Sequence, residues 1–417
     1  MKDKEKDVKQ KADSGNRQNR SSLIPHPSSL RLEPRLEAIV SQEYPRFSET
    51  EYARRHKLLG EVMAKAGIDH LLVVTDHRTG NAPQWVTGWP GTVEAYVIFK
   101  PGEKMVMHME WYNHFPLGKK IAKTTDVRWG EHKGLAKTIE ELKRRGAKRV
   151  GIMGPLVVGK YRQLEEHFQM VGLDADYVKL RMIKSEEEID WLRIGAAFSD
   201  AGFAALLSGT RPGLTERELG NIVERAYVGH GGTTMIHYIG RTSMANPHIF
   251  VPPQHHSPRK VESGDVIFCE LSAFFWDYPG QVLRTFTVGA DPSPLYRDLH
   301  ATAEAAFDAV TKVVRHGTTM PEIIEAAGVI ENNGFTVCDD LMHGFGGGYW
   351  PPVLGAKSRP AGPLPDMTLQ ENMTVVVQPN VITKEQTAGV QVGELIRITK
   401  TGFEKLHNTA RGFFRAG

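Results

Sequence analysis

The sequence predicts an α+β protein with two folded domains, and three observations support this. The 417 residues are enough for two or three hydrophobic cores. Residues 43–178 alternate short apolar runs with amphipathic helical patterns, which is typical of an α/β layer domain. From residue 179 the pattern changes to long helices and to strands separated by Gly and Pro turns. We therefore expect an N-terminal α/β domain over 43–178 and a larger α+β domain over 179–417.

The segment ahead of the first domain has a different composition. Residues 1–42 are rich in Lys, Asp, Gln, Ser and Arg and contain few apolar residues. Such a segment cannot bury enough apolar surface to offset the entropy lost on ordering. We predict a disordered tail for residues 1–42 and assign it no function.

The first domain is expected to open with a helix. Ser48 is followed by Glu-Thr-Glu, a typical capped helix start, and apolar residues continue at helical spacing through Met63. Four apolar runs bounded by Gly, Pro or Asp predict buried strands at 71–74, 95–99, 105–109 and 149–153. The charged segment 135–145 predicts a second helix.

The second domain begins with a stronger helix signal. Ser185 and Glu188 form a capping-box pattern ahead of a long amphipathic helix that runs towards Leu207. Thr215 starts another helix, and residues 299–315 predict a third. Strands are expected at 265–273, 283–288, 374–378 and 390–399. The sequence has no internal period of the kind that marks a repeat array.

Composition makes several functional classes improbable. A formal net charge of +3 is small for this length, and no basic run interleaves with aromatic residues, so we expect no nucleic-acid partner. No stretch approaches the roughly 18 apolar residues of a membrane span. The two cysteines, Cys269 and Cys338, are too few for a disulfide framework or thiolate cluster. The N-terminus lacks a secretory apolar segment, so a cytoplasmic location is expected.

Three blocks in the second half resemble the creatinase/aminopeptidase P/prolidase superfamily, known for its pita-bread fold. They are residues 182–189 (MIKSEEEI), residues 264–289 with Gly-Asp-Val and Arg-Thr-Phe, and the series 343–346, 375–379 and 389–394. The resemblance covers about residues 44–410. It implies a C-terminal pita-bread domain preceded by a creatinase-type N-terminal domain. It also implies a homodimer.

The resemblance also locates the positions where the superfamily's metallopeptidases hold two metal ions. By this resemblance, the five positions are Glu270, Gln281, His343, Gln378 and Gly393. Two divalent ions need several anionic oxygens, and this set offers one carboxylate. We therefore expect no metal cofactor. The alternative is one divalent ion on Glu270, His343 and either Glu394 or Asp277.

Metal-free relatives suggest which residues act instead. Creatinase is similar and hydrolyses a C–N bond with His and Glu. His248 is the nearest match to its histidine, although His255 or His256 in the same long loop could take that place. A neutral imidazole can pass a proton between water and a leaving amine. His248 is therefore a candidate acid or base.

Glu270 and Glu394 are further catalytic candidates because each lies in an apolar strand, where burial raises a carboxyl pKa. For Glu270 the structural alternative is an ion pair with Arg284 or Arg397. His343 precedes Gly-Phe-Gly, where small residues let a ligand approach the backbone.

Four residues are candidates for substrate binding. The amides of Gln281 and Gln378 can both donate to and accept from a urea-like or amide-like group. Asp277 and Trp89 are the other two, Trp89 as an apolar pocket residue. Creatine itself is an unsuitable substrate, because the resemblance finds no match for creatinase's substrate-binding carboxylates.

These observations predict a metal-independent hydrolase that cleaves a C–N bond in a small amide, urea, guanidino or cyclic amidine compound. Three alternatives remain open. The chain is an Xaa-Pro aminopeptidase or dipeptidase with a degenerate metal site, a lyase acting on an onium-type metabolite, or a catalytically inactive binding module.

Overall fold

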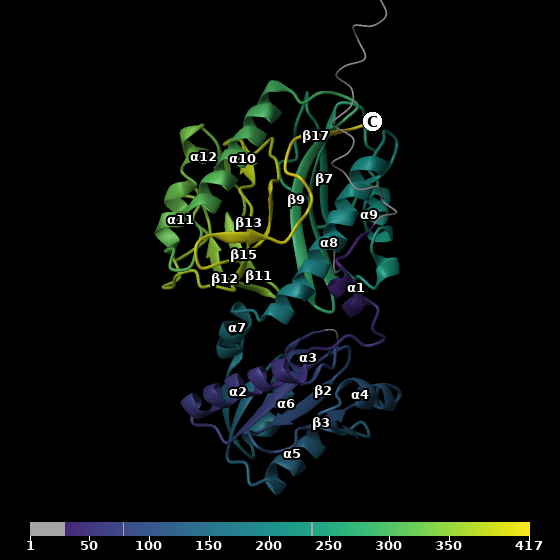
Figure 1. Ribbon diagram of the computed structural model, residues 1–417, viewed down its shortest axis with the longest axis vertical. Coiled ribbons are helices and arrows are strands. Elements are labelled where there is room, and N and C mark those ends of the chain that lie inside the picture. The colour runs from purple at the N-terminus through teal and green to yellow at the C-terminus, as the bar shows by residue number, and fades with distance from the viewer. Residues whose placement is uncertain (1–29, 78, 235–236) are drawn as a thin grey trace, which may run out of the picture.

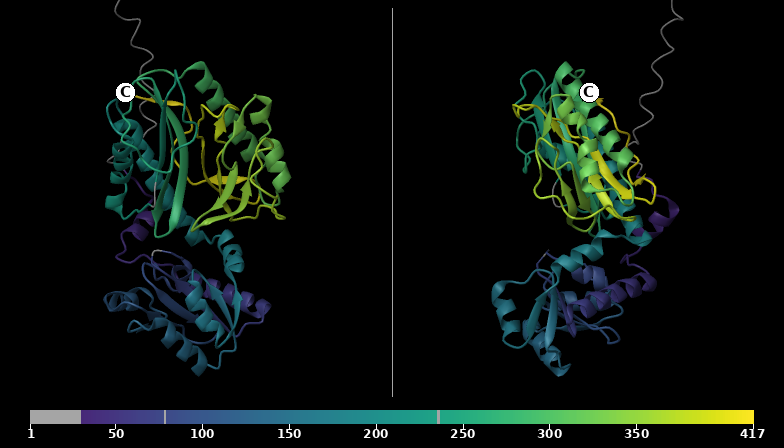
Figure 2. Two further views of the ribbon diagram at one scale, coloured as in Figure 1. Left: turned by 180° about the vertical axis from the view of Figure 1, so that it is seen from behind. Right: turned by 90° about the vertical axis from the view of Figure 1, so that its left-hand side faces the viewer.

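The computed structural model describes residues 30–417 apart from residues 78 and 235–236, and it shows two lobes, one above the other (Figures 1 and 2). The smaller lobe is built on a six-stranded sheet of order β4-β3-β2-β1-β5-β6. Its strands are β1 (His70–Thr75), β2 (Ala95–Phe99), β3 (Val106–Met109), β4 (Asp126–Trp129), β5 (Arg149–Met153) and β6 (Gln169–Gly172). Its helices are α2 (Glu49–Ala66), α3 (Ala82–Thr87), α4 (Phe115–Ile121), α5 (Gly134–Arg144) and α6 (Val158–Glu165), with a short 3₁₀ turn η1 (Tyr112–His114).

The central strand β1 explains why this lobe is a layered domain. All six of its residues are buried. Leu71 and Val73 pack into one hydrophobic core, whereas Leu72 and Val74 pack into the other. Successive side chains of a strand point to opposite faces, so a continuous apolar run requires cover on both sides of the sheet. The predicted α/β layer domain is confirmed.

The larger lobe is built on a strongly curved sheet of order β12-β11-β13-β15-β9-β8-β7 (Figure 1). The strands are β7 (Tyr238–Ser243), β8 (Asp265–Phe275), β9 (Tyr278–Val288), β11 (Met342–Phe345), β12 (Tyr349–Leu354), β13 (Thr374–Val377) and β15 (Gly393–Ile398). Strand β16 (Phe403–Lys405) pairs with β15, β17 (Phe414–Ala416) runs parallel to β9, and β10 (Thr336–Val337) pairs with β14 (Val381–Ile382). The helices are α8 (Glu186–Gly209), α9 (Glu216–Arg225), α10 (Pro294–Val313), α11 (Met320–Ala326) and α12 (Val329–Asn332), with a 3₁₀ turn η2 (Val228–His230).

Helix α8 begins where its sequence predicts. The Ser185 hydroxyl accepts a hydrogen bond from the Glu188 backbone, and the Glu188 carboxylate accepts one from the Ser185 backbone. The helix packs on Ile267, Cys269 and Leu271 of β8. Glu270 therefore points to the opposite face of the sheet. None of the helices in the described part of the chain is long and apolar enough to cross a membrane.

The structure corrects two predictions about chain organisation. Helix α1 (Pro34–Val40) lies within the segment predicted to be a disordered tail, and its Leu36 is buried in the core around α8. The prediction is therefore wrong for residues 30–42, and the rest of the predicted tail lies outside the described residues. The predicted boundary at residue 178 also falls inside a helix, α7 (Asp174–Met182), which joins the two lobes.

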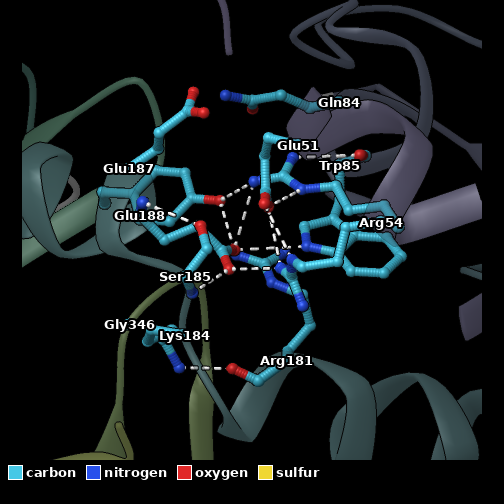
Figure 3. Close-up of polar contacts among 12 residues, drawn as sticks. Glu51, Arg54, Gln84, Trp85, Arg181, Lys184, Ser185, Glu187, Glu188 and Gly346 are labelled. Atoms are coloured by element: carbon cyan, nitrogen blue, oxygen red, sulfur yellow. Dashed lines mark hydrogen bonds and ion pairs between the residues drawn. The ribbon is translucent and has the colours of Figure 1, made fainter. Parts of the chain in front are cut away.

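A buried ionic cluster holds the two lobes together (Figure 3). Glu188 of α8 is 1% exposed and pairs with Arg54 (3.1 Å) and Arg55 (3.3 Å) of α2. It also accepts a hydrogen bond from the Tyr278 hydroxyl (2.8 Å). Glu51 pairs with both arginines, at 2.7 and 2.6 Å. Buried charges are tolerated when they are paired and hydrogen-bonded, so this cluster fixes how the lobes meet.

Candidate functional site

Strand register gathers the five aligned positions on one face of the curved sheet. Glu270 pairs with Leu283, which pairs with Gly393. His343 and Leu395 both pair with Val376. Paired residues share a face and side chains alternate, so Glu270, Gln281, His343, Gln378 and Gly393 all lie on the face opposite α8. The sheet therefore gathers these side chains into one cluster, called the recess below, from β8, β9, β11 and the ends of β13 and β15.

A carboxylate and an amide are bonded to each other at the centre of this recess. The Gln281 side-chain nitrogen donates to Glu270 Oε1 at 2.5 Å. Gln281 is 2% exposed, whereas Glu270 is partly exposed. At the position where two carboxylates could share metal ions, this chain instead has a hydrogen bond between the side chains of Gln281 and Glu270.

Two further carboxylates approach the recess from the loop ahead of β11. The Asn380 amide donates to Asp339 Oδ2 at 3.0 Å, and the Gln378 amide donates to the Asp340 carbonyl at 3.2 Å. Sequence reasoning missed Asp339 and Asp340. The available signal was a pair of adjacent acids three and four residues ahead of the candidate His343.

The carboxylates of the recess perturb one another. Burial and the charges of Asp339 and Asp340 raise the pKa of Glu270 to about 8. Burial and Asp340 raise the pKa of Asp339 to about 7, although Asn380 and Arg359 oppose the shift. Within the described residues, none of the three carboxylates has an ion-pair partner within 4.0 Å. The recess therefore favours protons, or a positively polarised ligand, near neutral pH.

His343 is buried and covered by an aromatic ring. Its imidazole stacks on Tyr349 with ring centroids 4.2 Å apart. Burial lowers the pKa of His343, with Asp340 opposing. Nδ1 lies 3.3 Å from the Gly344 carbonyl, which can only accept, so Nδ1 carries the hydrogen in the neutral ring. Nε2 is then the nitrogen without a hydrogen, and the ring also interacts with the Gln378 side chain.

The recess has more acceptors than donors. Four of its buried side-chain oxygens have no hydrogen-bond partner within the part of the chain that the structure describes: Gln281 Oε1, Gln378 Oε1, Asp339 Oδ1 and Asp340 Oδ2. Unpaired buried acceptors are costly. A ligand that supplies several N–H donors would satisfy them.

The donor set does not fit a pair of divalent ions. Glu270 is the single carboxylate among the five positions and already accepts the Gln281 amide. Among the described residues no group of three His, Cys, Asp or Glu side chains is placed to hold a metal ion. Amides are weak neutral ligands, so the five aligned positions alone leave two such cations largely uncompensated.

Glu394 has a structural partner instead of a place in the recess. It pairs with Val282, so its side chain lies on the opposite face from Glu270. There its carboxylate forms an ion pair with Arg284 at 2.6 Å, and both side chains are 1% exposed. The predicted catalytic position of Glu394 is corrected: Arg284 pairs with Glu394, not with Glu270.

His248 is not joined to the recess by a hydrogen bond in the described residues. Its Nδ1 lies 3.2 Å from the Thr242 hydroxyl. Thr242 of β7 pairs with Val266 of β8, which is four residues before Glu270. His256 Nε2 bonds to the His237 carbonyl at 2.5 Å, and His255 is exposed. A proton-transfer role for His248 stays a prediction.

The remaining two candidates, Trp89 and Asp277, lie in different parts of the structure. Trp89 is 1% exposed and belongs to the core of the small lobe, so its predicted place in a ligand pocket is corrected. Asp277 lines a cleft of about 930 Å³ between the lobes, together with Trp276, Trp350 and Asn81. Gly347 and Gly348 also line the cleft and immediately precede Tyr349, which covers His343. The cleft therefore adjoins the recess.

Comparison with known proteins agrees with this architecture. Residues 190–400 match the model of metallopeptidase family M24. A protein of Bacillus subtilis named as an uncharacterized peptidase is 26% identical over 373 residues, 82% of this chain and 95% of that protein. The Xaa-Pro dipeptidase of Pyrococcus furiosus is 23% identical over 273 residues, 63% of this chain and 74% of that enzyme.

Solved structures show the same fold. An Xaa-Pro dipeptidase from Bacillus anthracis superposes with a TM-score of 0.76 at 21% identity, covering 87% of this chain and 99% of that one. An X-Pro aminopeptidase from Thermotoga maritima gives 0.74 at 19% identity, covering 87% and 99%. The expected pita-bread domain with a creatinase-type N-terminal domain is confirmed.

Proposed function

The chain belongs to metallopeptidase family M24, and from this premise we propose that it is a hydrolase that cleaves a C–N bond in a small amide, urea, guanidino or cyclic amidine compound without a metal ion. The observation that carries the proposal is the hydrogen bond from Gln281 to Glu270 at the centre of the recess. It stands where a metal-bridging pair of carboxylates would be needed. The chemistry of the side chains then has to replace that of the metals.

The protonation states of His343 and Glu270 indicate which residue acts as the base and which as the acid. Neutral His343 removes a proton from water through Nε2, and the water oxygen attacks the substrate carbon. Protonated Glu270, with its pKa of about 8, donates its proton to the departing nitrogen as the C–N bond breaks. The acceptor oxygens of Gln281 and Gln378 bind the N–H groups of the substrate.

An Xaa-Pro dipeptidase or aminopeptidase is the second candidate, and the similarity to the Xaa-Pro dipeptidases of Pyrococcus furiosus and Bacillus anthracis favours it. Its scissile bond is also a C–N amide bond. The two candidates differ in metal dependence, because the relatives belong to a family described as metallopeptidases.

One experiment separates them. The purified full-length chain is analysed for bound metal and assayed with and without EDTA on Xaa-Pro dipeptides and on a panel of amides, ureas, guanidines and cyclic amidines. We expect less than one metal ion per chain and EDTA-resistant turnover of a panel member. EDTA-sensitive Xaa-Pro cleavage with about two ions per chain would overturn the proposal.

Variants then locate the chemistry. Glu270→Gln and His343→Ala are each expected to lower turnover by roughly 100-fold or more, as is usual for loss of a general acid or base. Glu385→Gln, a change at an exposed residue, is the matched control. Full activity in both site variants would refute the assignment. An absence of turnover across the whole panel would favour a binding module instead.

A further inference from the structure

The described residues that line the cleft between the lobes include one charged side chain and several aromatic ones. Asp277 is the one charged residue among the described residues that line it. Phe274, Trp276 and Trp350 supply aromatic surface. A volume of about 930 Å³ is at the upper end of the range of pockets that hold small organic ligands. The cleft is thus a ligand-sized space with one negative charge.

Asp277 has no ion-pair partner among the described residues. No Lys, Arg or His nitrogen of residues 30–417, apart from 78 and 235–236, is paired with its carboxylate within 4.0 Å. Its one hydrogen-bond donor there is the Asn81 amide, at 2.5 Å from Oδ2. Arg181 is hydrogen-bonded to this group through Tyr177 and Asn81, and its charge lowers the pKa of Asp277 without fully offsetting the effect of burial, which raises that pKa. A partly buried carboxylate without a paired cation is a favourable partner for a cationic ligand.

The backbone at this position is held in an uncommon conformation. Trp276 and Asp277 form the turn between β8 and β9, and both have positive φ angles, 46° and 75°. A two-residue hairpin of type I′ requires positive φ at both of its central residues, so the hairpin itself sets this conformation. The small lobe holds the turn in place, because Gln84 donates to the Trp276 carbonyl at 2.6 Å and Asn81 binds the Asp277 carboxylate. Two domains thus cooperate to fix one carboxylate in the cleft.

We propose that this cleft binds an organic amine in its cationic form, with the ammonium group on Asp277 and the hydrocarbon part against Trp276 and Trp350. Cations are attracted to aromatic rings as well as to carboxylates, so both kinds of residue favour the same ligand. An anionic ligand would find no cationic lining residue within the described cleft. The inference concerns binding alone and stands independently of the proposed hydrolysis.

A matched ligand pair tests the charge requirement. Isothermal titration calorimetry on the full-length chain compares 2-phenylethylammonium with 2-phenylethanol, which has a similar shape and no charge. We expect the ammonium compound to bind at least about tenfold more tightly, the contribution of one charge-assisted hydrogen bond. Equal affinity for the two compounds would overturn the proposal.

Variants locate the bound cation. Asp277→Asn suits the test, because Asn tolerates the left-handed conformation and its carbonyl oxygen can still accept from Asn81. It should weaken ammonium binding at least about tenfold while leaving the thermal midpoint unchanged. Asp366→Asn, at an exposed loop residue, should bind as the wild type does. Loss of binding in Glu270→Gln with full binding in Asp277→Asn would place the cation in the recess and refute the assignment.

Discussion

The buried carboxylate of Glu188 offers the sharpest test of how the two lobes are held together (Figure 3). Glu188→Gln keeps the shape of the side chain and removes its charge. The carboxylate is 1% exposed and contacts Arg54, Arg55 and the Tyr278 hydroxyl. Its loss leaves the fully buried Arg55 guanidinium with Glu51 as its remaining carboxylate partner among the described residues. We expect the free energy of unfolding to fall by about 3–5 kcal/mol, the usual cost of breaking a buried ion pair.

The matched control lies two residues earlier on the same helix. Glu186 pairs with Arg397, but its side chain is 69% exposed. Exposed ion pairs contribute about 0–1 kcal/mol, so Glu186→Gln should change stability little. Urea unfolding at pH 7, followed by tryptophan fluorescence and circular dichroism, measures both variants. If Glu188→Gln is destabilised by no more than 1 kcal/mol relative to Glu186→Gln, the cluster does not hold the lobes together.

Three more predictions follow from buried groups. Burial alone would raise the pKa of Glu188, but the nearby cations, first Arg55 and then Arg181, hold it at about 2. The contribution of Glu188 to stability is therefore complete above pH 4.5 and lost as the pH falls towards 2, so Glu188→Gln should flatten that part of a stability–pH curve. Glu394→Gln should lower the free energy of unfolding by about 3–5 kcal/mol, because Glu394 forms a buried ion pair with Arg284. The pH profile of turnover should stay unchanged, and a shifted profile would support a catalytic role for Glu394. Gly347→Ala should lower the thermal midpoint of unfolding, because Gly347 has a φ of +83° and an added Cβ would lie 1.8 Å from Arg181 Nη2. An unchanged midpoint would contradict this expectation.

Local signals in the sequence predict most of the regular structure. The capping box at Ser185 and the apolar run of β1 act within a few residues, so they can be recognised without the fold. Helix α1 was missed because composition was averaged over a polar segment. Its stability comes from Leu36 packing against α8, a tertiary contact that composition does not reveal.

The site is only partly predictable for a similar reason. Glu270, Gln281, His343 and Gln378 are found by resemblance, and strand register does place them on one face. The alternation of side chains also implies that if Gly393 faces the recess, Glu394 must face away. Asp339 and Asp340 could not be found in this way, because sheet curvature and a loop bring them to Glu270.

The chain enters and leaves the small lobe at neighbouring points. Ser48, which caps α2, donates its backbone N–H to Glu187 at 2.8 Å, next to the residue where the chain returns into α8. Because α1 already packs against α8, the small lobe is an insertion whose two ends lie side by side. The small lobe can therefore be deleted as one continuous segment of the chain. Joining residue 47 to residue 182 by a short linker would keep the Ser185 cap of α8 and the pairing of Ile183 with Met373, but would remove Asn81 and Gln84, the two amides that bind the turn at Trp276 and Asp277.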